Sequence, residues 1–146
     1  MKLTIELRNG LLIFLGIATL FFVMKLVGLE KMDSLRVLNV FKVYYGMKKT
    51  LEANKIQKVF DFWENIFSIF KTALIGISLS IIGLYLYIYL NGGQEYLNQI
   101  SKGYFSIENP TVIEYCFGLY SEGIASAVIL TFLCMQYWKP KTSDNI

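Results

Sequence analysis

One apolar run near the middle of the chain, KTALIGISLSIIGLYLYIYL at Lys71–Leu90, limits the possible folds more than any other feature of this sequence. Residues 72–90 carry no charge, and none of them is more polar than Thr, Ser or Tyr. About 20 apolar residues, at about 1.5 Å of rise each, cross a hydrocarbon layer of about 30 Å. A chain of 146 residues has little room to bury such a run in a soluble core. The sequence therefore predicts an integral membrane protein with a transmembrane helix over residues 72–90.

The composition agrees with this prediction. Hydrophobic residues make up 55% of the chain and charged residues only 17%, whereas a soluble domain has about 25% charged residues. Only two prolines occur, and no low-complexity linker or internal repeat is visible. We therefore expect a single all-α membrane domain over residues 1–146, built as a helical bundle.

Three further segments are candidates for membrane spans. Residues 11–28 form an apolar run with no small-residue cleavage pattern after it, which favours an uncleaved first span over a signal peptide. Residues 112–138 are long enough to form the last span. Residues 35–49 are amphipathic and ambiguous. If they cross, the fold is a bundle of four transmembrane helices; the alternative is three spans plus one interfacial amphipathic helix.

Two connections are expected to lie outside the hydrocarbon. Residues 52–70 predict an interfacial helix, because one apolar stripe recurs along it at helical spacing, formed by Ile56, Phe60, Trp63, Phe67 and Phe70. Residues 91–110 predict an outer loop that contains a short helix. Asn109, followed by Pro110, is expected to cap the last span.

The distribution of basic residues predicts the orientation. With four spans, one side carries nine Lys and Arg residues and the other carries three, Lys31, Arg36 and Lys102. The basic side is cytoplasmic by the positive-inside rule, so both termini are expected in the cytoplasm of a bacterium, with the protein in the inner membrane. With three spans the N-terminus lies outside, and the connection 29–71 still carries an inside bias.

Four charged residues are candidates for a polar or ion-pair site: Glu122, Lys25, Glu114 and Lys42. A carboxylate within a span is a functional candidate by default, and Glu122 lies well inside the last span. The structural alternative is an ion pair, and we expect one between Lys25 and Glu122. Glu114 lies in the first turn of the last span, where a carboxylate suits the helix dipole.

Small residues recur on one side of the span 72–90. Ala73, Gly76, Ser80 and Gly83 fall within a narrow arc of a helix. Small residues at this spacing allow two helix backbones to approach closely. We expect a helix-packing seam against another span of the same chain; a seam between two copies is the alternative.

Several function classes lack support in the sequence. Histidine is absent, which removes the commonest general base and metal ligand. The two cysteines, Cys116 and Cys134, lie five helical turns apart in one expected helix and cannot pair with each other. No catalytic constellation, cofactor motif or metal spacing is present, and the net charge of +3 comes with no basic cluster for nucleic acid. We expect a protein that is not an enzyme and holds no cofactor.

From Phe67 to Asn91 the sequence FSIFKTALIGISLSIIGLYLYIYLN resembles small four-span bacterial inner-membrane proteins of a domain-of-unknown-function family. In that family a small-residue span ends in an aromatic-x-Tyr pattern. Ala73 or Gly76 stands where the family tends to place glycine, whereas Asn91-Gly92 replaces a frequent asparagine-proline. The resemblance covers the middle of the chain and implies no catalytic residues.

Two functions remain open at this point. The first is an accessory or scaffold subunit of the bacterial cytoplasmic membrane. The second is a small transporter or channel protomer that uses Glu122 and Lys42 on a polar path. The expected partners are the lipid bilayer and either a second copy of the chain or another membrane protein, with no nucleic acid.

Overall fold

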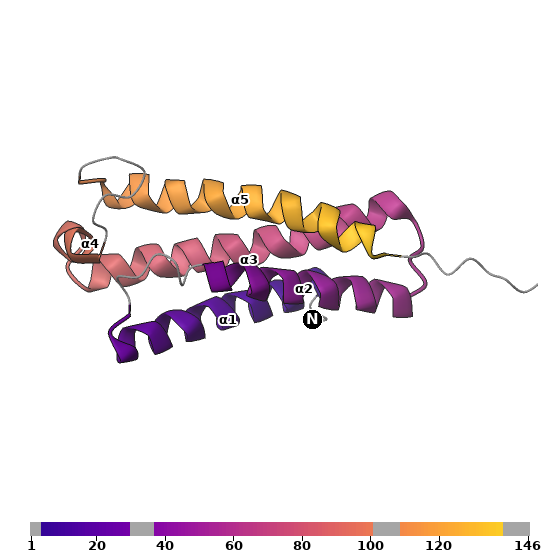
Figure 1. The fold of residues 1–146 in the computed structure, drawn as a ribbon, viewed down its shortest axis with the longest axis horizontal. Coiled ribbons are helices and arrows are strands. Elements are labelled where there is room, and N and C mark those ends of the chain that lie inside the picture. The colour runs from indigo at the N-terminus through magenta and orange to yellow at the C-terminus, as the bar shows by residue number, and fades with distance from the viewer. Residues whose placement is uncertain (1–3, 30–36, 101–108, 139–146) are drawn as a thin grey trace, which may run out of the picture.

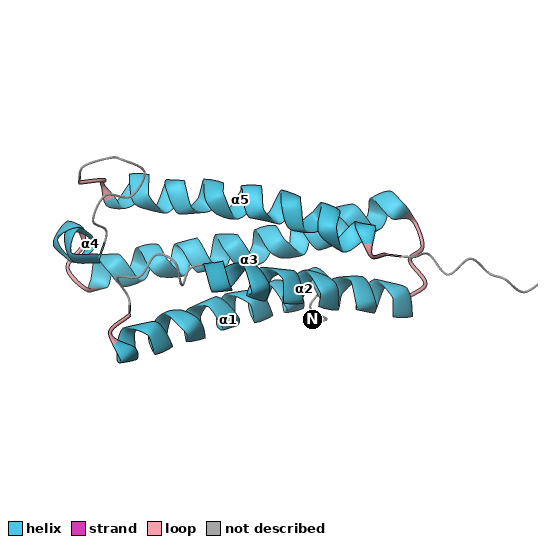
Figure 2. Cartoon of the chain, viewed as in Figure 1, coloured by secondary structure: helices cyan, strands magenta, loops and turns pink. Residues whose placement is uncertain are grey.

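The computed structural model describes residues 4–29, 37–100 and 109–138. In these ranges the chain is all-α, as predicted, and forms five helices (Figure 2). They are α1 (Ile5–Val27), α2 (Val37–Ile56), α3 (Phe62–Leu90), α4 (Gln94–Ile100) and α5 (Val112–Gln136). Figure 1 shows four long helices side by side along one axis, with the short α4 at one end. The fold is a helical bundle.

The central helix of the bundle is α3. It packs against α1, α2, α4 and α5, while α2 packs mainly against α1 and α3. The helix α3 contains the apolar run from which the membrane prediction started. Three helices, α1, α3 and α5, are long and apolar enough to cross a membrane. The helix α2 has 20 residues but is more polar.

The prediction of one separate helix over residues 52–70 is wrong. Residues 52–56 belong to α2, and residues 62–70 are the first part of α3, which continues through Lys71 without a break. Between them the chain reverses at Lys58, whose φ of 59° lies in the left-handed region. Asp61 then caps α3 by accepting a 2.9 Å hydrogen bond from the Glu64 backbone N–H. The spacing of the apolar residues does not reveal this turn, because the apolar stripe continues from the end of α2 into the start of α3.

One further helix start and one helix cap differ from the predictions. Helix α1 starts at Ile5, six residues before the predicted span, with the Thr4 side chain as its cap. Helix α5 is capped by Thr111 and not by Asn109. The Thr111 hydroxyl accepts from the Glu114 N–H while the Glu114 carboxylate accepts from the Thr111 N–H. This reciprocal capping box satisfies two backbone donors. The predicted short helix in the 91–110 loop is present as α4.

The first turns of α3 are polar on the inside and aromatic on the outside. Trp63 and Phe67 are 64% and 68% exposed, whereas Asn65 and Thr72 are fully buried in the bundle. A helix end in water buries its aromatic face instead. Aromatic side chains on the outer surface are typical of helix ends at a membrane interface.

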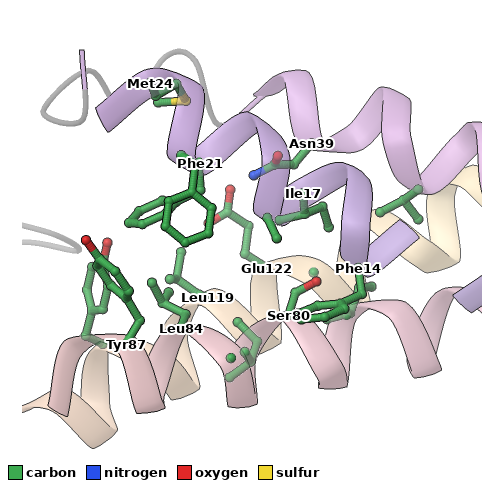
Figure 3. Close-up of a pocket in the computed structure, with 18 of the residues that line it drawn as sticks. Phe14, Ile17, Phe21, Met24, Asn39, Ser80, Leu84, Tyr87, Leu119 and Glu122 are labelled. Carbon is green, nitrogen blue, oxygen red and sulfur yellow. The ribbon is translucent and has the colours of Figure 1, made fainter. Parts of the chain in front are cut away.

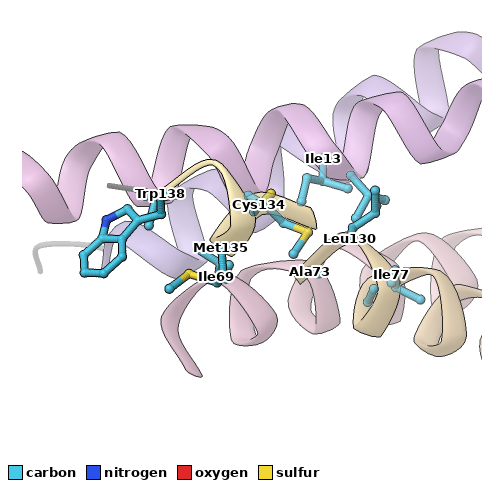
Figure 4. Packing of buried hydrophobic residues seen from close by; sticks show 12 residues of the cluster. Ile13, Ile69, Ala73, Ile77, Leu130, Cys134, Met135 and Trp138 are labelled. Atoms are coloured by element: carbon cyan, nitrogen blue, oxygen red, sulfur yellow. The ribbon is translucent and has the colours of Figure 1, made fainter. Parts of the chain in front are cut away.

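The largest cluster of buried apolar residues lies between the four long helices (Figure 4). Ile13 of α1 is fully buried in this cluster, facing Gly46 of α2 and Gly76 of α3. Ala73 is also fully buried in this cluster. Because glycine has no Cβ, three helix backbones can close around one isoleucine side chain.

Candidate functional site

The small-residue face of α3 lies against α1 of the same chain. A Cβ atom added at Gly76 would come 2.7 Å from the Ile13 Cβ and 3.1 Å from the Gly10 carbonyl oxygen. A Cβ added at Gly83 would come 3.1 Å from the ring of Phe14. The seam therefore joins α1 to α3, and its deeper part around Gly76 is the closer contact.

A cavity of about 310 Å³ opens beside this seam. Residues of all five helices line it, and α2 contributes only its first two turns, because it begins part-way along the bundle (Figure 1). Glu122 of α5 is exposed to the cavity, and Figure 3 shows its carboxylate pointing between Phe21 and Asn39. Most of the wall is apolar, and its aromatic members are Phe14, Phe21, Phe22, Tyr87, Tyr96 and Tyr115.

Two further polar groups reach this cavity. The Ser80 hydroxyl, on the predicted seam, donates a 2.7 Å hydrogen bond to the Gly76 carbonyl oxygen. The side-chain oxygen of Asn39 is buried and accepts no hydrogen bond within the described part of the chain. A buried acceptor without a donor costs free energy comparable to a lost hydrogen bond. The Asn39 side-chain oxygen is therefore a buried acceptor whose hydrogen bond the described residues do not supply.

Lys25 has a different partner from the one predicted. Its ammonium group donates a hydrogen bond to the hydroxyl of Tyr87. Between Lys25 and Glu122, both within the described ranges, no ion pair forms. The reason is their separation along the bundle: Gly123, next to Glu122, packs on Ile77, ten residues from Tyr87 on α3, or about 15 Å at the helical rise.

Lys42 and Glu122 are not brought together. The stem of Lys42 lies on Gly16 of α1, where its Cδ is 3.3 Å from the position of an added Cβ. Its surroundings form a shallow groove between α1 and α2 that Glu122 does not line. The other side chains of this groove are apolar or small: Leu12, Leu15, Thr19, Leu20 and Val23. The predicted polar path from Glu122 to Lys42 is therefore not continuous in the structure.

Glu114, the fourth candidate, has a structural role as part of the N-terminal cap of α5. Its carboxylate oxygen accepts a 2.8 Å hydrogen bond from the Thr111 backbone N–H and closes the capping box of α5. Glu114 does not line the cavity beside Glu122. It is therefore a natural control for charge changes on α5.

A buried polar network that the sequence did not predict lies at the other end of the bundle. The Asn9 amide donates to Thr50 at 2.9 Å, and the hydroxyls of Thr50 and Thr72 share a hydrogen bond of 2.9 Å. These contacts tie α1, α2 and α3 together at one level. A second layer links Asn54 to Asn65, and a third links Ser68 to Glu6.

The pattern that could have revealed this network is present in the sequence. Asn65, Ser68 and Thr72 recur at i, i+3 and i+7, opposite the aromatic stripe of the same helix. Thr50 and Asn54 follow the same rule on α2. Side chains that hydrogen-bond between helices stabilise membrane bundles in which the backbone groups are already paired.

Cys116 and Cys134 are both free and buried in α5. Across residues 4–29, 37–100 and 109–138, no group of three His, Cys, Asp or Glu side chains is placed to hold a metal ion. Comparison with protein families, curated proteins and solved structures gives no match for this chain.

Proposed function

We propose that all four long helices cross the membrane, with both termini in the cytoplasm. The contacts between helices support this topology. Asn9, Thr50 and Thr72 share one level of the bundle through their hydrogen bonds. Lys25 and Tyr87 mark a second level. From Thr72 to Tyr87 is about 22 Å at the helical rise, and α2 extends about 20 Å from Thr50 back to Val37.

Basic residues gather at the first of these levels. Arg8, Lys49 and Lys71 each directly precede a residue of the Asn9–Thr50–Thr72 layer. Three helices, including α2, therefore bring a cation to the same depth. This arrangement is expected where helices leave the hydrocarbon on the cytoplasmic side. It favours four spans over a model in which α2 lies along the surface.

Cysteine accessibility tests the topology. A single cysteine replacing Thr4, in a chain whose Cys116 and Cys134 are changed to alanine, is expected to react with a membrane-impermeant maleimide only after the cells are opened. A cysteine replacing Gly93, next to α4, is the matched control and is expected to react in intact cells. Labelling of the residue 4 cysteine in intact cells would exclude the four-span model.

Within this topology we propose a non-enzymatic accessory role, in which the protein binds another membrane protein through the groove around Lys42. The observation that carries this proposal is the position of Lys42. It lies eight residues from Thr50, or about 12 Å at the helical rise, and therefore close to the middle of the hydrocarbon. Within the described residues its ammonium group has no hydrogen bond or ion pair.

An ammonium group near the middle of the hydrocarbon needs a partner of opposite charge. The lysine stem spans about half the distance to either interface, and a cation in the bilayer centre costs at least about 2.5 kcal/mol. Lys42 is exposed on the outer side of α1 and α2 and faces away from the cavity. A membrane-spanning helix with an Asp or Glu near its centre would supply the opposite charge. Thr19, a small and exposed residue of the groove, leaves room for such a helix beside the Lys42 stem.

Cross-linking in native membranes tests this role. A photoreactive amino acid in place of Leu15, which is 61% exposed in the groove, is expected to yield an adduct with one other membrane protein. The cross-linked span should carry a central carboxylate. Lys42→Met is expected to reduce the adduct at least tenfold without lowering the thermal stability of the isolated protein, because an unpaired charge is removed.

Lys55→Met is the matched control, since Lys55 is an exposed lysine near the end of the same helix. It should leave the adduct unchanged. Adducts with lipid alone, or an adduct yield that does not depend on Lys42, would contradict the accessory role. An adduct between two copies of this chain would indicate a homo-oligomer instead of an accessory role.

A further inference from the structure

The groove around Lys42 continues toward the basic end of the bundle along two rows of residues. On α1, Arg8 lies four residues before Leu12 and seven before Leu15, and both leucines line the groove. On α2, Lys49 lies seven residues after Lys42. Residues at these spacings share one face of a helix. Arg8 and Lys49 therefore extend the two walls of the groove beyond the residues that line it.

Arg8 and Lys49 also lie at one level of the bundle. They directly precede Asn9 and Thr50, and the Asn9 amide donates to the Thr50 hydroxyl at 2.9 Å. Both cationic side chains are exposed, and neither forms an ion pair in the part of the chain that the structure describes. The Lys49 ammonium lies over the ring of Tyr45, 5.4 Å from its centroid, a contact that supplies no opposite charge. One end of the groove therefore carries two cations.

The groove thus presents positive charge at two depths. From Lys42 to Lys49 is about 10.5 Å along α2 at the helical rise. The phosphate of a lipid can reach the outer position, but it stays at the interface and does not reach Lys42. A helix lying in the groove reaches both depths, because residues seven apart recur on one of its faces. A helix with negative charge at both depths is the occupant that complements the whole groove.

We propose that the partner helix carries two carboxylates seven residues apart, one beside Lys42 and one on its cytoplasmic side, between Arg8 and Lys49. This pairing rests on the accessory role, in which a helix of another membrane protein lies in the groove, and it adds the chemistry by which that helix is recognised. The central carboxylate neutralises Lys42 within the hydrocarbon. The outer carboxylate accepts charge-assisted hydrogen bonds from the Arg8 guanidinium and the Lys49 ammonium. Both pairs form together because the spacing on the partner matches the spacing on α2.

Binding of designed transmembrane peptides tests the pairing. The full-length protein is placed in nanodiscs of phosphatidylcholine, whose headgroup has no net charge, and a fluorescent helical peptide of leucine and alanine is added. One peptide carries a central aspartate, a second carries a further aspartate seven residues toward one end, and a third carries none. We expect the peptide with two aspartates to bind about fivefold more tightly than the peptide with one, as for a well-placed ion pair at a partly exposed site.

The position of the outer aspartate and its partners on the protein are tested separately. An outer aspartate five residues from the central one is turned away from it by about 140° around the peptide, and the gain is expected to disappear. The double variant Arg8→Gln, Lys49→Gln is expected to reduce the gain to less than twofold. Lys71→Gln is the matched control, because Lys71 is exposed at the same level on α3 and the groove is lined by α1 and α2. It should keep the full gain.

The outcomes separate this pairing from the accessory role. If the peptide with one aspartate binds no more tightly than the peptide without, or if Lys42→Met leaves its binding unchanged, the accessory role fails and the pairing fails with it. If that peptide binds through Lys42 but the second aspartate adds nothing, only the outer pairing is overturned. A gain that survives the Arg8→Gln, Lys49→Gln change also overturns it. So does a gain that vanishes when phosphatidylglycerol is added to the nanodiscs, since an anionic headgroup would then occupy the outer position.

Discussion

Gly76→Ala is expected to lower the free energy of unfolding by about 2 kcal/mol, in the range typical of overpacked cores. The added Cβ would lie 2.7 Å from both the Cβ and the Cγ2 of Ile13, and 3.1 Å from the Gly10 carbonyl oxygen. The Ile13 Cβ and the Gly10 carbonyl oxygen cannot rotate away, because the backbone of α1 fixes their positions. Unfolding in mixed micelles with increasing sodium dodecyl sulfate measures the change.

Gly83→Ala is the matched control on the same helix. Its added Cβ would meet only the outer ring atoms of Phe14, which can move by a few tenths of an ångström. We expect a change of less than about 0.5 kcal/mol. The double variant with Ile13→Ala should lose less than the sum of the two single changes, because each relieves the other. Equal stability of the Gly76→Ala and Gly83→Ala proteins would contradict the packing described for Ile13.

Asn65→Ala is expected to cost about 3 kcal/mol, as loss of a fully buried side chain that makes several hydrogen bonds. The Asn65 amide donates to the carbonyl oxygens of Val59 and Asp61 at 3.1 and 2.8 Å. Its side-chain oxygen accepts from Asn54 at 3.1 Å. One residue therefore holds the turn between α2 and α3 against both helices. The same detergent titration measures the loss.

Phe67→Ala separates this role from a general effect of truncation on α3. Phe67 is larger than Asn65 but 68% exposed on the outer face of the helix. We expect its removal to change stability by less than about 1 kcal/mol. A larger loss for Phe67→Ala than for Asn65→Ala would mean that the aromatic stripe, and not the polar network, stabilises this end of the bundle.

Packing predictions that depend on one helix at a time agree with the structure most closely. The apolar run after Lys71 is part of the longest helix, and α3 packs against every other helix of the described chain. The small residues Gly76 and Gly83 face α1. The spacing of side chains along one helix determines which residues share a face, so periodicity is enough for such predictions.

Predictions that depend on the relative position of two helices succeeded less often. The sequence predicts that Lys25 pairs with Glu122, yet Lys25 donates to Tyr87 of α3. The axial position of α5 places the backbone next to Glu122 beside Ile77, ten residues earlier on α3. The sequence predicts a polar path that contains both Lys42 and Glu122, yet the two residues line different hollows. The axial stagger and the rotation of one helix relative to another depend on packing contacts, such as those of Ile13 with Gly46 and Gly76. A single sequence shows the small residues but not their partners.

An all-α chain with apolar segments long enough to cross a membrane follows from the sequence without a structure, because hydrophobic length and helical period are local properties. The presence of a carboxylate, Glu122, within such a segment follows from the sequence as well. The surroundings of each charge are known from the fold only. Glu122 lines an aromatic cavity with Asn39, and Lys42 lies on the opposite side of α1. A cavity and a groove are formed by several helices at once, so their chemistry depends on which helix faces meet.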